Sequence, residues 1–127
     1  MPFELIVNLP NQPGVLAAAA GAIGKENVNI RAFAAAAPGK TDEVRFLVDD
    51  AETAERALTE AGYKVRRQEV IAIRISNTPG ELAAHAERLA KAGINIEGGY
   101  LASAGDGDRL EIIFEVSDIK AAKKALR

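Results

Sequence analysis

The residues best suited to chemistry lie in a short phrase that the chain contains twice, Asn-x-Pro-Gly followed by an Ala-rich stretch. The two copies are Asn11, Gln12, Pro13, Gly14, Val15 and Leu16, and Asn77, Thr78, Pro79, Gly80, Glu81 and Leu82. An asparagine carboxamide both donates and accepts hydrogen bonds. Proline fixes the backbone near a helix start without removing a donor that the site needs, and glycine removes side-chain obstruction. Such a loop can hold a small polar group.

Each phrase leads into apolar residues that recur at helical spacing, so the loop is expected to open a helix. The first N–H groups of a helix have no partner within it, and the helix dipole places positive charge there. We expect the N–H groups of Gly14, Val15 and Leu16, and their counterparts in the second copy, to attract a carboxylate. The dipole contributes only about 0.3–2 kcal/mol per anion. A ligand therefore also needs the asparagine contacts and a side-chain pocket.

A second repeated phrase begins the next expected strand, as Asn29-Ile30 in the first copy and Asn95-Ile96 in the second. We expect these asparagines to contact the ammonium or carboxylate of the same ligand. The structural alternative is that the loop asparagine caps the helix, proline starts it and glycine relieves crowding, with no ligand involved. The recurrence of both phrases favours binding.

The elements that position these residues occur in the same order in each copy. Residues 3–9 and 69–75 are predicted first strands, because apolar side chains recur at every second position on one face, at Leu5, Val7 and Leu9 and at Ile71, Ile73 and Ile75. Each is followed by a helix and a hairpin, and Asp50 and Asp118 are predicted N-caps of second helices. A last strand at 63–68 completes the order βαββαβ in the first copy. This order predicts an α+β, ferredoxin-like fold, in which two helices cover one face of an antiparallel sheet.

The repeat predicts two tandem domains, residues 1–68 and 69–127, each near the lower size limit for an independent core. The second copy has no counterpart of residues 60–68, so its final strand is expected to be missing. That strand would flank the first one, which leaves an open edge beside residues 70–75. Because an apolar open edge invites pairing, we expect another chain, or a rearranged strand of this one, to cover it. A homodimer is the expected state.

Composition narrows the class of protein. The net charge of −2 and the small number of aromatic residues, two Tyr and four Phe, do not favour a nucleic-acid partner. No apolar run approaches membrane-spanning length, and the first residues do not read as a signal peptide, so a cytoplasmic location is expected. The absence of Cys excludes thiolate chemistry and Cys-based zinc sites. We expect no cofactor and no metal.

Together, the two phrases resemble the ACT domain, a ligand-binding regulatory module of many amino-acid-metabolism enzymes, and in particular the serine-binding domain of phosphoglycerate dehydrogenase. The resemblance implies that domains pair side by side into one continuous sheet. It also implies that a free amino acid binds at the line between the paired domains, the seam, near the loops 11–16 and 77–82. Glu81 departs from the pattern because its charge stands where the first copy has Val15. The first loop is therefore the preferred site.

Two classes of function follow. One is a stand-alone regulatory sensor that binds an amino acid and is read by a partner such as an amino-acid-metabolism enzyme. The other is an assembly or regulatory subunit of such an enzyme that binds no ligand. We do not expect an enzyme, because no nucleophile with a base, metal cluster or phosphate loop is evident. His85 is interpreted as structural, and Asp106 and Asp108 as turn residues.

Overall fold

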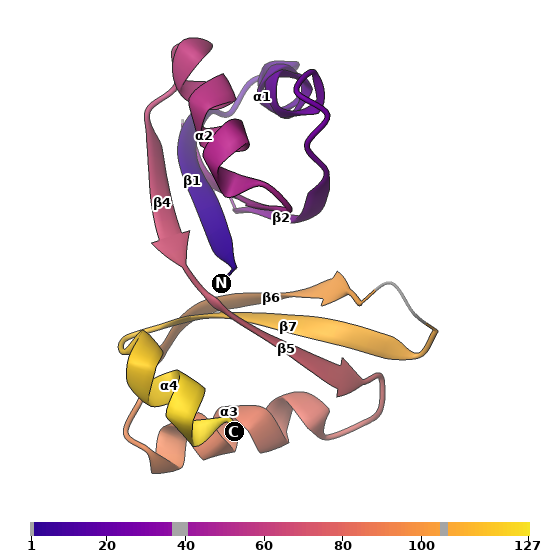
Figure 1. The fold of residues 1–127 in the computed structure, drawn as a ribbon, viewed down its shortest axis with the longest axis vertical. Helices are drawn as coiled ribbons and strands as arrows, with labels where there is room; N and C mark the ends of the chain where they lie inside the picture. Colours follow the sequence, from indigo (N-terminus) through magenta and orange to yellow (C-terminus); the bar gives the residue numbers. More distant parts are fainter. Residues whose placement is uncertain (1, 37–40, 105–106) are drawn as a thin grey trace. The chain divides into compact units, whose positions relative to one another are not determined.

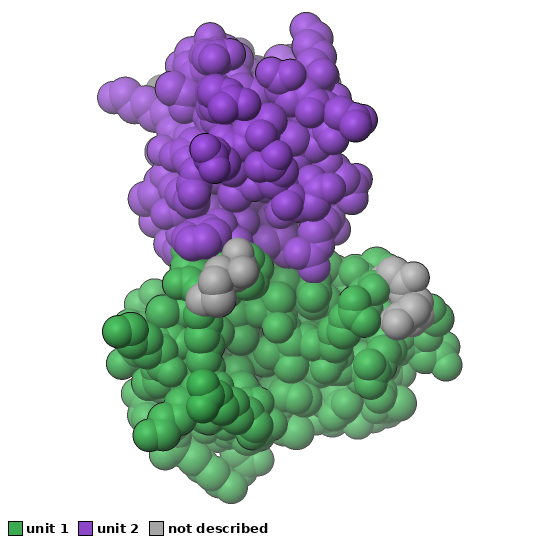
Figure 2. Space-filling model, viewed as in Figure 1, with its two compact units in different colours: residues 1–2, 69–127 green, residues 3–68 purple. Residues whose placement is uncertain are grey.

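The computed structural model describes residues 2–36, 41–104 and 107–127. The chain divides into two compact units, which we call the N-terminal unit (Phe3–Gln68) and the C-terminal unit (Glu69–Arg127 together with Pro2). Figure 2 colours them purple and green, respectively. The hairpin turns expected at Pro38-Gly39 and around Asp106 lie outside the described residues.

The N-terminal unit has the complete βαββαβ order predicted from the sequence (Figure 1). The elements are β1 (Phe3–Pro10), α1 (Val15–Gly24), β2 (Ile30–Ala36), β3 (Thr41–Val48), α2 (Ala51–Glu60) and β4 (Val65–Glu69). The four strands lie in the order β2-β3-β1-β4, and β3 is antiparallel to both β1 and β2. The order leaves β2 at one edge of the sheet.

The apolar side chains at every second position of β1 decide which face of this sheet packs against the helices. Leu5, Val7 and Leu9 are buried and pack with Phe46 of β3 in a single core. Helix α1 contributes Ile23 to that core, and α2 contributes small and branched residues of its own. As predicted, Asp50 is the N-cap of α2, where its carboxylate accepts from the backbone N–H of Thr53 at 3.1 Å.

Within the described part of the C-terminal unit, the same order of elements is repeated as far as the second helix. It contains β5 (Ile71–Ser76), α3 (Glu81–Lys91), β6 (Ile96–Ser103), β7 (Arg109–Val116) and α4 (Ile119–Ala125). The sheet order is β5-β7-β6, with both pairings antiparallel. Ile112 and Phe114 of β7 pack with Leu89 of α3 in the core. Asp118 caps α4 by accepting from Ala121 N–H at 3.0 Å, as predicted.

Strand β5 lies at the edge of this three-stranded sheet, in the place expected for a unit without a counterpart of β4. The N–H of Val70 donates to the carbonyl of Pro2 at 3.1 Å beside the start of the strand. A hollow of about 350 Å³ follows the edge, lined by Pro2, Val70 and β5, by Lys123 of α4 and by Leu126 just after that helix. That another chain, or a rearranged strand of this one, covers the edge of β5 stays a prediction.

The predicted fold class is confirmed, because both units are antiparallel α+β units with the ferredoxin-like order of elements. Among the described helices, none combines the length and the apolar character needed to cross a membrane.

Candidate functional site

The two Asn-x-Pro-Gly loops have the same backbone geometry. Gly14 and Gly80 are the N-cap residues of α1 and α3, with φ angles of 86° and 90°, in the left-handed region that glycine adopts readily. Neither helix has a side-chain cap. The residue after each asparagine makes the same turn. The backbone N–H of Gln12 donates to the carbonyl of Pro10, and that of Thr78 donates to the carbonyl of Ser76, both at 2.9 Å. The structural alternative in which asparagine caps the helix is therefore not the arrangement found.

The N–H groups at the start of α1 are only partly available. The N–H of Val15 donates to the carbonyl of Gln12 at 3.3 Å, so the expectation that this group is free is wrong. The N–H groups of Gly14 and Leu16 have no hydrogen bond to any described residue. These two donors, with the positive end of the helix dipole behind them, remain for an anion.

At the start of α3, a carboxylate of the chain itself reaches back over the loop. Oε1 of Glu81 accepts from the backbone N–H of Ser76, the last residue of β5, at 3.3 Å. Nothing equivalent exists at the start of α1, where the first turn has no acidic residue. The C-terminal loop therefore already has negative charge next to its helix start.

The loop asparagines are exposed, and the second loop is tied to its hairpin. The N–H of Asn77 donates to the carbonyl of Asp108, just before β7, at 2.8 Å. Gln12 and Thr78, which follow the asparagines, are also exposed, as are Pro13 and Pro79. The loop side chains are thus accessible to a small molecule.

Within one unit, the structure does not bring Asn29 or Asn95 to these loops. The carbonyl of Asn29 accepts from the N–H of Asp49, just after β3, whereas the first loop follows Pro10, which pairs with Thr41 at the start of β3. Eight residues of strand span about 25 Å. The C-terminal unit repeats this separation, because Asn95 bonds to Ser117 at the end of β7. Ile30 and Ile96 begin the same strands and are half-buried.

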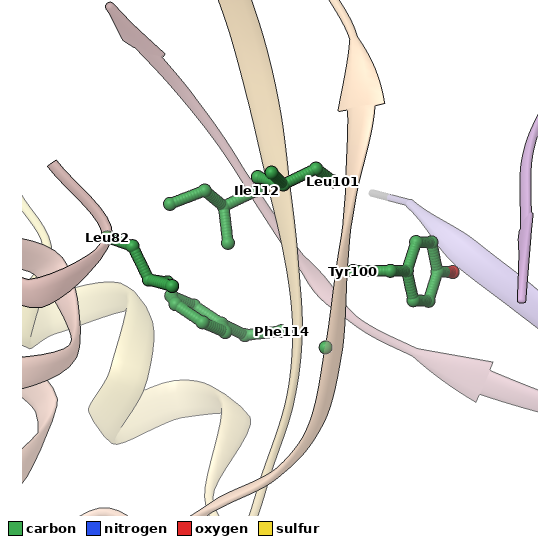
Figure 3. Close-up of a pocket in the computed structure, with 6 residues that line it drawn as sticks. Leu82, Tyr100, Leu101, Ile112 and Phe114 are labelled. Atoms are coloured by element: carbon green, nitrogen blue, oxygen red, sulfur yellow. The ribbon is translucent and has the colours of Figure 1, made fainter. Parts of the chain in front are cut away.

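A hollow of about 230 Å³ lies beside the start of α3, on the helix-covered face of the sheet. It is lined by Leu82 from the first turn of α3 and by residues of β6 and β7, namely Gly99, Tyr100, Leu101, Ile112 and Phe114. In Figure 3, Leu82 and Phe114 face each other, and the Tyr100 ring points away from them. The sequence-based reasoning missed this hollow. The signal was the pair Gly98-Gly99 inside a strand, where glycine is unfavourable unless something approaches closely.

The single histidine of the chain, His85, lies in α3. His85 Nδ1 lies 2.9 Å from the carbonyl of Glu81 one helical turn earlier, which is a local contact. Among the described residues, no three His, Cys, Asp or Glu side chains are grouped so that they could hold a metal ion.

The fold and the two loops define the class of these units. Each is a small α+β domain in which an exposed loop after the first strand leads to a helix with glycine at its N-cap. The sequence profile of the ACT domain matches residues 3–63, so the N-terminal unit is an ACT domain, which confirms the resemblance seen in the sequence. The C-terminal unit repeats its order of elements and its loop.

Solved structures with the same fold extend over nearly the whole chain. Protein BT0572 from Bacteroides thetaiotaomicron has a TM-score of 0.90 and 26% identity, covering 98% of this chain and 85% of its own. The ligand-free regulatory subunit of aspartate kinase from Thermus thermophilus has a TM-score of 0.76 and 21% identity, covering 99% and 89%. The corresponding subunit from Thermus flavus has a TM-score of 0.68 and 22% identity, covering 98% and 90%. No curated protein matches the chain.

Proposed function

We propose that this protein is a regulatory sensor that binds a free amino acid, and that the loop 11–16 of the N-terminal unit holds the ligand carboxylate. The observation that carries the proposal is the start of α1. There a left-handed glycine replaces a side-chain cap, and the N–H groups of Gly14 and Leu16 have no hydrogen bond to the described residues. Asn11 lies in the same exposed loop and can supply a carboxamide contact.

The N-terminal loop is preferred over the C-terminal loop for an electrostatic reason. A ligand carboxylate at the start of α3 would meet the carboxylate of Glu81, whereas at the start of α1 the same position holds Val15. Like charges at contact distance oppose each other, and the repulsion is of the same order as the attraction of the helix dipole. The loop 77–82 therefore binds the same ligand more weakly.

The remaining ligand contacts come from a paired unit. Edge strands that pair in antiparallel fashion bring the start of one strand to the end of the other. The asparagine before β6, Asn95, would then approach the loop beside the end of β2, and Asn29 would approach the loop 77–82. This places the ligand at the seam implied by the family resemblance and accounts for the distance between loop and asparagine within one unit.

Regulation of an enzyme is the function that this binding would serve. The fold is shared with proteins described as regulatory subunits of aspartate kinase. We infer a partner enzyme of amino-acid metabolism that responds to the occupied chain.

An assembly subunit without a ligand is the second candidate. It is supported by four large apolar side chains that are 40–55% exposed: Leu16, Phe33, Leu82 and Leu101. Such residues are typical of protein interfaces when they cluster.

Thermal unfolding of the purified chain, measured in the presence of each amino acid at millimolar concentration, distinguishes the regulatory sensor from the assembly subunit. A ligand at about a hundred times its dissociation constant adds roughly 2.7 kcal/mol and raises the unfolding midpoint by several degrees. Asn11→Ala should reduce that shift more than Asn77→Ala, with the midpoint of the free protein unchanged in both. A midpoint that no amino acid moves would support the assembly subunit instead.

A further inference from the structure

The outer edge of β5 lies where the N-terminal unit has its fourth strand. In that unit β4 lies beside β1, the strand to which β5 corresponds in the repeat. Two side chains of that segment, Tyr63 just before β4 and Val65 at its start, are partly buried against the N-terminal core. Among the described residues of the C-terminal unit no strand has this place, and the hollow of about 350 Å³ lies there. The hollow therefore has the position of a strand with apolar side chains at every second residue.

The chain itself engages the backbone at both ends of this edge. The N–H of Val70 donates to the carbonyl of Pro2 at 3.1 Å just before β5 begins. The N–H of Ser76, at the end of β5, donates to Oε1 of Glu81 at 3.3 Å. Backbone N–H groups two residues apart in a strand point to the same side. Ala72, between these two ends, therefore directs its N–H to the outer edge, where a further strand would find a donor.

The surroundings of this edge are basic. Helix α4 packs against β5, and its three lysines, Lys120, Lys123 and Lys124, share one face at the helical spacing i, i+3 and i+4. Lys123 lines the hollow, and its Nζ lies 2.8 Å from a carboxylate oxygen of Glu69. Lys120 and Lys124 are exposed and make no ion pair with a described residue. Arg74 of β5 adds a fourth cation to the rim of the hollow.

The needs of the helix do not explain these lysines. The helix dipole favours a cation in the last turn of a helix and disfavours one in the first turn. Lys123 and Lys124 lie in the last turn of α4, but Lys120 is its second residue, in a first turn without an acidic side chain. Lys120 and Lys124 are also like charges at i and i+4, which destabilises a helix. An acidic partner would convert both of these unfavourable placements into attraction.

We propose that the outer edge of β5 binds an extended acidic segment of a partner protein. Apolar residues at every second position of that segment enter the hollow, and acidic residues beside them meet Arg74 and the lysines of α4. The segment adds a strand to the C-terminal sheet through main-chain hydrogen bonds, as in other cases of strand addition. A second copy of this chain fits poorly, because two β5 edges would bring their cations together. The docking does not depend on an amino acid in the loops.

A synthetic heptapeptide, Glu-Val-Glu-Tyr-Glu-Val-Glu with a fluorophore at its amino end, is the probe. Its control has Lys in place of every Glu, which keeps the alternation and reverses the charge. Fluorescence anisotropy with the full chain should show that the acidic peptide binds at least about tenfold more tightly than the basic one. The difference should shrink as salt is added, because salt screens exposed charges.

Reversal of the two exposed lysines of α4 tests the role of charge. Lys120→Glu combined with Lys124→Glu should weaken binding of the acidic peptide by about fivefold or more, with an unchanged circular dichroism spectrum because both side chains are exposed. Lys25→Glu combined with Lys64→Glu is the matched control, since it changes the net charge equally at exposed positions of the N-terminal unit. The control should bind the peptide within about twofold of the wild type. Equal losses in the two double variants would overturn the proposal.

Hydrogen exchange locates the peptide on the chain. The amide of Ala72 should exchange about tenfold or more slowly at saturating acidic peptide, because the added strand gives its N–H an acceptor. An unchanged exchange rate at Ala72, or an acidic peptide that does not bind, would overturn the proposal. So would an Ala72 amide that slows with protein concentration alone, because a second copy would then occupy the edge. These outcomes are independent of amino-acid binding, so failure of this docking site is distinguishable from failure of the sensor.

Discussion

The carboxylate of Glu81 accepts a hydrogen bond from the backbone N–H of Ser76 across 3.3 Å, and the N-terminal unit cannot form this contact. The residue corresponding to Ser76 is Pro10, which has no N–H, and the residue corresponding to Glu81 is Val15. The C-terminal loop thus has both the N–H donor and the carboxylate acceptor, and the N-terminal loop has neither. The difference makes the two loops electrostatically unequal although their backbones agree.

Exchange of these residues should exchange the binding behaviour of the loops. Val15→Glu places a carboxylate beside Gly14 that has no N–H of residue 10 to bond, so the affinity for the amino acid should fall by about tenfold or more. Glu81→Val should strengthen binding at the C-terminal loop. Binding isotherms of the two variants check this. Val15→Gln, which has the same length without the charge, should lose much less affinity, and equal losses in Glu and Gln variants would contradict the electrostatic explanation.

Glycine at the helix start and glycine within the helix should respond oppositely to alanine. Gly14 has a φ of 86°, and a Cβ there would meet nothing within 4 Å, so Gly14→Ala has only backbone strain as its cost, about 1–2 kcal/mol. Gly21 lies inside α1 with equally open space, so Gly21→Ala should stabilise by about 0.5–1 kcal/mol. Urea unfolding of both variants provides the measurement. A stabilising Gly14→Ala would show that the left-handed N-cap is not present in solution.

Much of this fold was predictable because local signals agreed with one another. Alternation in β1, the capping residues Asp50 and Asp118 and the repeated loop each point to the same order of elements, and the structure confirms it. The site was predictable only in part. Backbone geometry decides that the Val15 N–H is used within the loop. Strand direction decides that Asn29 lies far from that loop. The hollow at Gly99 depends on which residue lies opposite Phe114, and register is fixed only in the folded sheet.

Two phenylalanines in one cross-strand pair should differ in their effect on folding. Phe46 is 1% exposed and Phe33 is 54% exposed. Phe46→Ala should reduce the free energy of unfolding by about 3–5 kcal/mol, because it removes a core ring and leaves a cavity. Phe33→Ala, measured at a concentration where the chain is single, should change it by about 0.5 kcal/mol or less. Similar losses in the two variants would mean that β2 does not hold Phe33 at the surface.

The N-cap of α2 should make stability sensitive to acid. The side-chain hydroxyl of Thr53, and then its backbone N–H, donate to Asp50 and lower the pKa of its carboxyl group. A lowered pKa in the folded state means that the contribution is fully present above the unfolded-state pKa, about 3.9, and is lost as the pH falls through the folded-state value. The unfolding midpoint of wild type and of Asp50→Asn should therefore differ above pH 5 and converge in acid. A constant difference down to pH 2 would contradict this.

The central claim is that an amino acid binds through the N-terminal loop. Calorimetric titration of the wild type and of Val15→Glu with the amino acid that gives the largest thermal shift tests it most directly. The account predicts one high-affinity site per chain in the wild type, lost in Val15→Glu while the circular dichroism spectrum stays unchanged. An isotherm of Val15→Glu that overlays that of the wild type, or a wild type that takes up no amino acid, would contradict it.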